Sequence, residues 1–119
     1  MATIGPGRIF WAIAPGERGG GKSRPMIVVS RQVDIIRTGQ VFVVVCSTDF
    51  EPPVRDHEVE LPHDTDRKSI TGLPKPTVAV CNWTTTYSVV DIRETAGLIP
   101  AHLLREIRRK AGIDLPPER

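Results

Sequence analysis

The chain has 119 residues, of which 39% are hydrophobic and 25% are charged. This length fits a single domain over residues 1–119. Such a domain buries roughly two-thirds of the surface of its unfolded chain, which is enough for a hydrophobic core without disulfides or a structural metal. Sixteen Lys and Arg against fourteen Asp and Glu leave a net charge of only +2, which excludes a strongly basic protein but permits a local basic patch.

Short apolar segments separated by Gly and Pro predict five or six strands. The expected strands cover residues 8–14, 25–30, 41–46, 57–61 and 77–83. The β-forming run over residues 84–90 either continues the last strand as a bent strand or makes another. Pro25 is expected at the first position of its strand, because proline donates no ladder hydrogen bond. One or two helical turns are expected over residues 31–37.

The last expected element is a helix with Pro100 in its first turn and a stop at Gly112. An apolar stripe at helical spacing supports it: Leu103, Leu104, Ile107 and Ala111. The basic residues lie off this stripe, where the helix dipole favours cations, so we interpret them as a solvated helix end: Arg105, Arg108 and Arg109. Residues 114–119 are expected to fray. These elements favour a mainly β fold, a small half-open barrel of five to seven short strands with a C-terminal α-helix.

Several common sites and locations are disfavoured. No apolar stretch approaches the roughly 20 residues that cross a bilayer, and no signal-peptide pattern opens the chain, so we expect a cytoplasmic protein. Cys46 and Cys81 lie in apolar runs, and we interpret them as buried thiols rather than a disulfide. No Cys or His spacing fits a zinc site, so neither a metal nor a cofactor is expected.

The glycine-rich loop before the second strand contains a phosphate-binding pattern. Residues 16–23 read GERGGGKS and match GxxxxGKS letter for letter. In a nucleotide-binding loop this pattern is followed by a helix, whose N-terminus holds the phosphate. Here Arg24, Pro25 and a β-branched run follow, so we interpret the segment as a flexible lid beside a strand.

The three histidines are most simply surface residues: His57, His63 and His102. Whether His57 or His63 takes part in acid–base chemistry stays open, because a histidine titrates near neutral pH.

Polar side chains gather at the ends of three expected strands. Arg24 begins one strand; Ser47 and Thr48 end another, and Asn82 and Trp83 end a third. If these strands are neighbours, their ends meet at one edge of the sheet, beneath the loop that carries Arg18, Lys22 and Ser23. A guanidinium binds phosphate bidentately, and a tryptophan stacks on a base. The combination suits single-stranded RNA, although the carboxylates of a peptide fit a charged edge equally well.

The order of these segments resembles that of the MazF/PemK toxins, the toxin halves of bacterial type II toxin–antitoxin pairs. The resemblance spans roughly residues 7–111 and is carried by GRIFW (7–11), KSRPMIVVS (22–30), RTG (37–39), VVVCST (43–48), HEVELP (57–62), GL (72–73) and PTVAV (76–80). It implies an SH3-like barrel, a homodimer, and metal-independent cleavage of single-stranded RNA, including mRNA. It also implies a cognate antitoxin whose disordered C-terminal segment lies along the toxin.

The resemblance also implies a mechanism, attack of the RNA 2′-hydroxyl on the adjacent phosphate, and two catalytic residues. Arg24 would stabilise the transition-state charge and donate a proton, and Thr48 would contact the phosphate or the 2′-hydroxyl. The residues expected to bind RNA are Arg18, Lys22, Ser23, Ser47, Asn82 and Trp83.

The chain departs from the family at other positions. Asn82 stands where many members have an acid, and Thr85 where they have an Arg; Val80 stands where the PemK-like branch has an Arg. The loop histidine of that branch is missing from residues 16–23. An amide is no general base at neutral pH.

Three other hypotheses therefore stay open. A catalytically degenerate homologue would bind RNA or antitoxin without cleavage. A toxin of the same fold would act on DNA gyrase, as the CcdB toxins do. Finally, Arg24 would hold the loop by bonding strand-end carbonyls. The sequence identifies neither the general base nor the RNA sequence that is cut.

Overall fold

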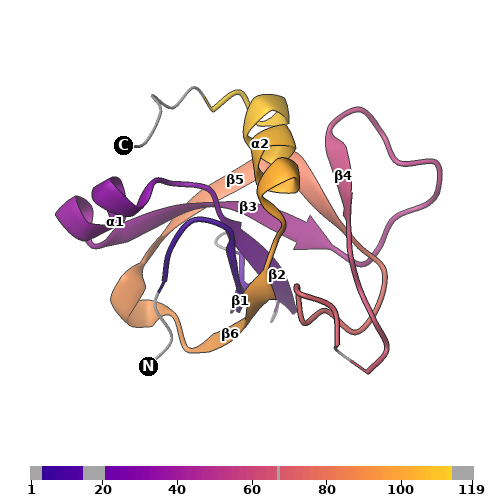
Figure 1. Cartoon of the computed structure of the whole chain (residues 1–119), viewed down its shortest axis with the longest axis horizontal. Coiled ribbons are helices and arrows are strands. Elements are labelled where there is room, and N and C mark those ends of the chain that lie inside the picture. Colours follow the sequence, from indigo (N-terminus) through magenta and orange to yellow (C-terminus); the bar gives the residue numbers. More distant parts are fainter. Residues whose placement is uncertain (1–3, 15–20, 67, 114–119) are drawn as a thin grey trace.

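The computed structural model describes residues 4–14, 21–66 and 68–113. These residues form a six-stranded sheet, two α-helices and a 3-10 turn (Figure 1). In chain order the elements are β1 (Arg8–Ile13), β2 (Ser23–Val28), α1 (Gln32–Thr38), β3 (Gln40–Ser47), β4 (Glu58–Leu61), β5 (Thr77–Ser88), η1 (Val89–Asp91), β6 (Glu94–Leu98) and α2 (Ala101–Lys110). None of the helices in this part of the chain is long and apolar enough to span a membrane.

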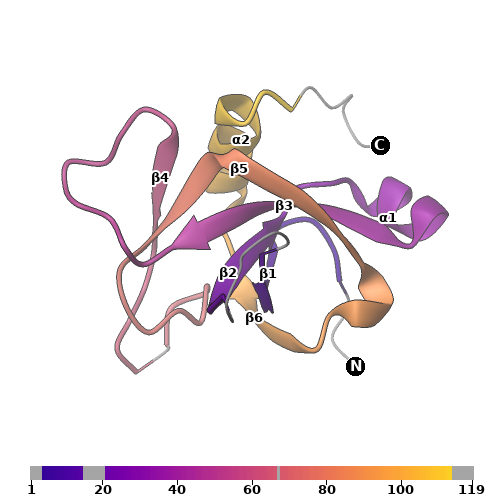
Figure 2. The same cartoon turned by 180° about the vertical axis from the view of Figure 1, so that it is seen from behind.

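The sheet has the strand order β4-β5-β3-β2-β1-β6, and every neighbouring pair is antiparallel. It curls into a half-open barrel, and α2 packs against β4 and β5. Figure 2 shows β5 crossing the molecule from the side of β4 to η1. The predicted fold class is confirmed.

The strands are apolar on both sides of the pleat, so the curled sheet buries two hydrophobic clusters. One cluster lies beneath α2 and includes Ile9, Ile27, Val29, Val44, Cys46, Ala79, Cys81 and Ile107. The other occupies the opposite face and includes Phe10, Met26, Val28, Ile35, Val41, Val43 and Val45. Successive residues of β1, β2 and β3 alternate between the two clusters, as the period of two requires.

Two strands differ from their predicted limits. Pro25 is the third residue of β2, opposite Trp11, and not the first as predicted. It is tolerated because the pairing of β2 with β3 begins only at Met26. β5 is a single bent strand: Val44 pairs with Thr84, whereas Cys46 pairs with Ala79, so β5 bulges away from β3 over residues 80–83.

β6 and η1 were not predicted. β6 pairs with β1 and is crossed by the loop before β5, where the backbone N–H of Gly97 donates to the carbonyl of Thr71 (2.8 Å). A Cβ at residue 97 would overlap the carbonyl oxygen of Ile70. Only glycine lets the two backbones approach so closely, and this contact holds the loop against the barrel.

The helix α2 begins after Pro100, and Gly112 follows it with a φ of 73°, as predicted. The interpretation of its basic end as fully solvated is wrong for Arg108, which is half-buried and donates from Nε to the carbonyl of Val29 (2.8 Å). The neighbouring Lys110 donates to the carbonyl of Glu58 (3.2 Å). These two side chains fasten α2 to the sheet, whereas Arg105 and Arg109 are exposed.

Candidate functional site

The adjoining ends of β2 and β3 enclose a small pocket of about 120 Å³, here called the cationic pocket. Its walls are Trp11, Lys22, Ser23, Arg24, Pro25, Cys46, Thr48 and Lys75. β2 and β3 are neighbours in the sheet, so Arg24 at the start of one strand and Thr48 just past the end of the other line the same pocket. Arg24 and Thr48 therefore lie at the same edge of the sheet, as predicted.

Three cations from separate segments surround this pocket. Lys22 precedes β2, Arg24 lies in β2, and Lys75 comes from the loop before β5. Lys22 forms an ion pair with the exposed carboxylate of Asp49, with 2.5 Å between Nζ and Oδ2. This hydrogen bond is the main cause of a lowered Asp49 pKa, and the charges of Arg24 and Lys75 lower it further. Because all three cations attract the Asp49 carboxylate, a phosphate placed in this pocket would be attracted by the same three side chains.

The Arg24 guanidinium lies over the ring of Trp83, with its central carbon 5.1 Å from the ring centroid. This is a cation–π distance. Trp83 lies in the bulge of β5 and packs against the cluster that contains Phe10, so the ring is anchored in the core. The contact crosses β3, which separates β2 from β5, and it limits where the guanidinium can go.

The other residues predicted to bind RNA have different surroundings. Ser47 is buried, and its hydroxyl accepts the backbone N–H of Asp49 (3.0 Å), so it shapes the turn after β3 and does not line the pocket. Asn82 and Trp83 lie inside the bulge of β5 and do not end a strand, contrary to the prediction, and Asn82 is exposed. Lys22 and Ser23 line the pocket. Arg18 lies outside the described residues.

Five residues of this region were not predicted as site residues: Trp11, Pro25, Cys46, Asp49 and Lys75. Cys46 and Cys81 are buried and free, as predicted. Burial is the main cause that raises the pKa of each thiol, to about 11 for Cys81. Cys46 therefore contributes a neutral wall to the pocket and no thiolate nucleophile.

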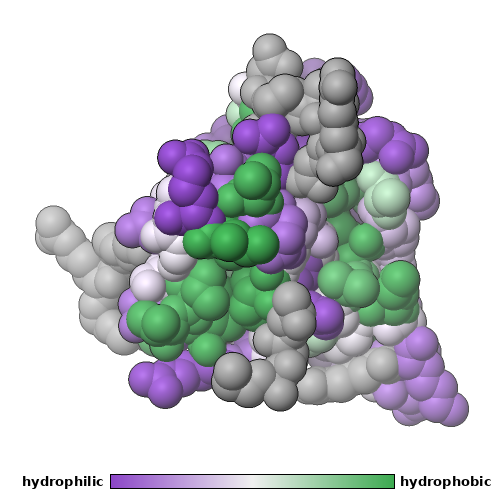
Figure 3. All heavy atoms as spheres, turned by 60° about the vertical axis from the view of Figure 1, so that its left-hand side comes forward, coloured by the Kyte–Doolittle hydropathy of each residue, from purple (hydrophilic) through white to green (hydrophobic). Residues whose placement is uncertain are grey.

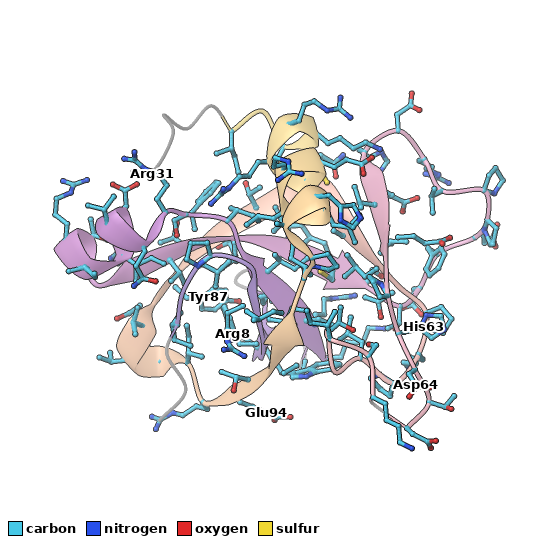
Figure 4. The ribbon with its side chains drawn as sticks, viewed as in Figure 1. Arg8, Arg31, His63, Asp64, Tyr87 and Glu94 are labelled. Atoms are coloured by element: carbon cyan, nitrogen blue, oxygen red, sulfur yellow. The ribbon has the colours of Figure 1, made fainter. Side chains whose placement is uncertain are left out.

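The histidines lie outside the pocket. His63 and His102 are exposed, as predicted, whereas His57 is half-buried. The backbone carbonyl of His57 accepts the N–H of Cys81 (2.8 Å). Figure 4 shows His63 and Asp64 on the loop after β4, and Arg8 and Glu94 in another region, near β6. Within the described residues no group of three or more His, Cys, Asp or Glu could hold a metal ion.

A second pocket of about 480 Å³, here called the β3–β4 pocket, lies between the turn after β3 and the start of β4. Its walls are Asp49, Phe50, Glu51, Arg55 and Glu58. Asp49 belongs to its wall and also pairs with Lys22 of the cationic pocket. The two pockets are therefore joined by a single carboxylate.

Comparisons with known proteins agree with this architecture. A family model described as "PemK-like, MazF-like toxin of type II toxin-antitoxin system" matches residues 6–113. The fold is similar to that of MazF from Deinococcus radiodurans, with 22% identity, a TM-score of 0.71, and coverage of 94% of this chain and 96% of that chain. It is also similar to the Mycobacterium tuberculosis toxin MazF-mt6, with 24% identity, a TM-score of 0.64, and coverage of 91% and 99%.

The similar structures include complexes of a toxin with its antitoxin. One is a MazE–MazF structure from Deinococcus radiodurans, with 20% identity, a TM-score of 0.68 and coverage of 94% of both chains. Another is an endoribonuclease with its cognate antitoxin from a mycobacterial species, with 14% identity, a TM-score of 0.68, and coverage of 96% of this chain and all of that chain. No curated protein matches the sequence. At these identities the likeness to solved structures concerns the fold.

Proposed function

Because the chain belongs to the PemK-like, MazF-like toxins of type II toxin–antitoxin systems, we propose that it is an endoribonuclease that cleaves single-stranded RNA without a metal. The observation that supports this most is the cationic pocket, which Lys22, Arg24 and Lys75 line together with Thr48. Such a pocket suits a single phosphate group, since hydrogen bonds and cations aimed at one oxyanion stabilise developing charge.

The proposed reaction is an internal transfer. The 2′-oxygen of the RNA attacks the adjacent phosphorus while the bond from phosphorus to the 5′-oxygen breaks. The products are a cyclic 2′,3′-phosphate and a 5′-hydroxyl end. Negative charge grows on the phosphate oxygens in the transition state, where Arg24 and the two lysines stabilise it. Arg24 or its hydration shell supplies the proton to the leaving oxygen, and Thr48 positions the phosphate.

The 2′-proton needs an acceptor, and Asn82 offers none. Asp49 does: it follows Thr48, contacts Lys22 of the cationic pocket, and is an exposed carboxylate whose pKa is lowered further by Lys22, so it is ionised at neutral pH. We assign the role of general base to Asp49. RNA is the substrate in this scheme because the reaction uses the 2′-hydroxyl, which DNA lacks.

The same proposal includes partners and a location. The chain would act as a homodimer in the cytoplasm, where mRNA is found, and a cognate antitoxin would neutralise it. An exposed apolar face supports a protein partner: Figure 3 shows hydrophobic residues gathered on the side that carries α1 and η1. The exposed large apolar side chains of these two elements are Val33, Ile36 and Val90.

The direct test is incubation with a panel of single-stranded RNAs in EDTA, followed by analysis of the new 5′ ends. Cleavage with 5′-hydroxyl ends is expected for the wild type and is expected to disappear in Arg24→Ala. Arg105→Ala, which removes an exposed arginine of α2, is the matched control and should cut normally. Tight RNA binding without cleavage would favour a degenerate homologue. Inhibition of DNA supercoiling with intact RNA would favour action on gyrase.

A further inference from the structure

The β3–β4 pocket is the larger of the two pockets, and the proposed reaction leaves it without a role. Its volume of about 480 Å³ lies in the range of about 300–1,000 Å³ that is typical of ligand sites. It opens on the same turn that carries Thr48 into the cationic pocket, since Thr48, Asp49 and Phe50 are consecutive. A ligand that spans both pockets needs only to pass Asp49.

The walls of this pocket combine an aromatic ring, one guanidinium and three carboxylates. The Glu58 carboxylate accepts the backbone N–H of Arg55 (2.9 Å), which ties the loop to the start of β4. The side chains of Glu51 and Arg55 are exposed, and neither forms an ion pair with another described residue. Glu51 and Arg55 therefore offer an acceptor and a donor fork to a ligand.

This set of groups does not suit a phosphate, because carboxylates outnumber cations and would repel it. It suits the edges of an unstacked nucleobase. A carboxylate accepts two neighbouring N–H groups, and a guanidinium donates to two neighbouring acceptors. Guanine presents both patterns, with N1–H and the N2 amino group on one edge and O6 and N7 on another. Adenine and uracil present neither pattern, and cytosine presents only the neighbouring acceptors.

We propose that the β3–β4 pocket binds a guanine of the RNA, next to the phosphate held in the cationic pocket. Glu51 accepts from N1–H and the N2 amino group, Arg55 donates to O6 and N7, and Phe50 supplies a ring surface for the base. This inference rests on the proposed function, since it names the base that accompanies the cleaved phosphate.

The carboxylates repel the RNA backbone, so this pocket adds little to the affinity for RNA. It instead favours one base over the others. Asp49, Glu51 and Glu58 repel the RNA backbone as a whole. Only a base that replaces water on the carboxylate with two N–H donors offsets this repulsion, so other bases are disfavoured in the same place. The cationic pocket supplies the general attraction to phosphate.

The experiment measures binding of short 2′-fluoro RNAs, which cannot undergo 2′-attack, by fluorescence anisotropy. Each RNA carries one guanine in a uridine background, and matched RNAs carry inosine, adenine, cytosine or uracil in its place. We expect the wild type to prefer guanine over inosine by about 10-fold or more, because inosine lacks the N2 amino group. Glu51→Gln should abolish this preference. Glu60→Gln, which changes an exposed carboxylate of β4 outside the pocket, should keep it.

Each outcome separates the pocket from the nuclease. Equal affinity for guanine and uracil, or a preference that survives in Glu51→Gln, overturns the guanine pocket even if unmodified RNA is cut by an Arg24-dependent reaction. A guanine preference that depends on Glu51 supports the pocket even if unmodified RNA stays intact, which would refute the nuclease alone. A protein that binds none of these RNAs overturns the guanine pocket, whereas cleavage of unmodified RNA still decides the nuclease.

Discussion

The cationic pocket and the β3–β4 pocket lie on either side of Asp49, yet they have opposite charge and different size. The first is small and lined by three cations, whereas the second is about four times larger and lined by three carboxylates and one arginine. Thr48 belongs to one and Phe50 to the other. One turn of chain therefore presents a surface for a phosphate and, next to it, a surface that repels phosphate and accepts N–H donors.

This contrast indicates that general attraction to RNA and selection of a base belong to different pockets. Cations attract any RNA backbone, and this attraction weakens as salt rises. Carboxylates and a guanidinium in a larger pocket distinguish bases through the pattern of donors and acceptors. With this division, substitutions in the cationic pocket are expected to change the binding and cleavage of all RNAs, whereas substitutions in the β3–β4 pocket are expected to change the preference for one base.

The largest effect is expected for Arg24→Ala. Removing a group that stabilises the transition-state oxyanion lowers kcat by about 100-fold to 1,000-fold. Loss of its contact with the Trp83 ring has a minor cost in stability. Cleavage kinetics and the melting temperature together check this. Loss of activity that accompanies unfolding, or activity equal to that of Arg105→Ala, would contradict the assignment.

Asp49→Asn changes the residue shared by the pockets and is expected to lower kcat by about 100-fold, the typical contribution of a general base. Because its pKa is lowered in the folded protein, wild-type activity should fall only at strongly acidic pH, and this acid limb should be absent from the variant. A pH–rate profile checks this. An acid limb that persists in Asp49→Asn would show that another group accepts the proton.

Lys75→Ala is expected to weaken RNA binding by about 10-fold for all sequences, since a phosphate contact carries no base information. The slope of log affinity against log salt should fall by about one unit. Titrations at several salt concentrations check this, with the exposed Lys68→Ala as control. A change confined to RNAs that contain guanine would instead assign Lys75 to base recognition.

The smallest expected effect concerns stability against pH. Because the folded-state Asp49 pKa lies below its ordinary value of 3.8, the Lys22–Asp49 pair stabilises the fold above that pH. The stabilisation is lost as the pH falls through the lower folded-state value. The pair is exposed, so the difference in melting temperature between wild type and Asp49→Asn should be small near neutral pH and vanish in strong acid.

Much of the sheet and part of the site could be predicted from the sequence. The β-branched run of β3 and the Arg-Pro pair of β2 placed Arg24 and Thr48 at one edge, because neighbouring strand ends meet. Lys75 could not be found this way, since it lies between two prolines in a loop without periodicity. The β3–β4 pocket was missed for the same reason: loop residues meet through the path of the backbone, which has no period to detect.

Other misses have their own physical causes. β6 was not recognised because its sequence, ETAGL, contains a glycine and few β-branched residues, and its position follows from the loop contact at Gly97. Arg108 lies off the apolar stripe of α2, yet its long side chain reaches the carbonyl of Val29, an interaction that helical spacing does not encode.

The burial of Cys46 has a consequence for observing this molecule. Its side chain lines the cationic pocket but is 0% exposed, and its pKa is raised by burial and by Cys81. A thiol reagent can therefore reach it only when the fold opens locally around β3. The rate at which Cys46 is labelled therefore measures how often the barrel opens locally. An anion bound in the cationic pocket is expected to lower this labelling rate, and the measurement needs no RNA cleavage.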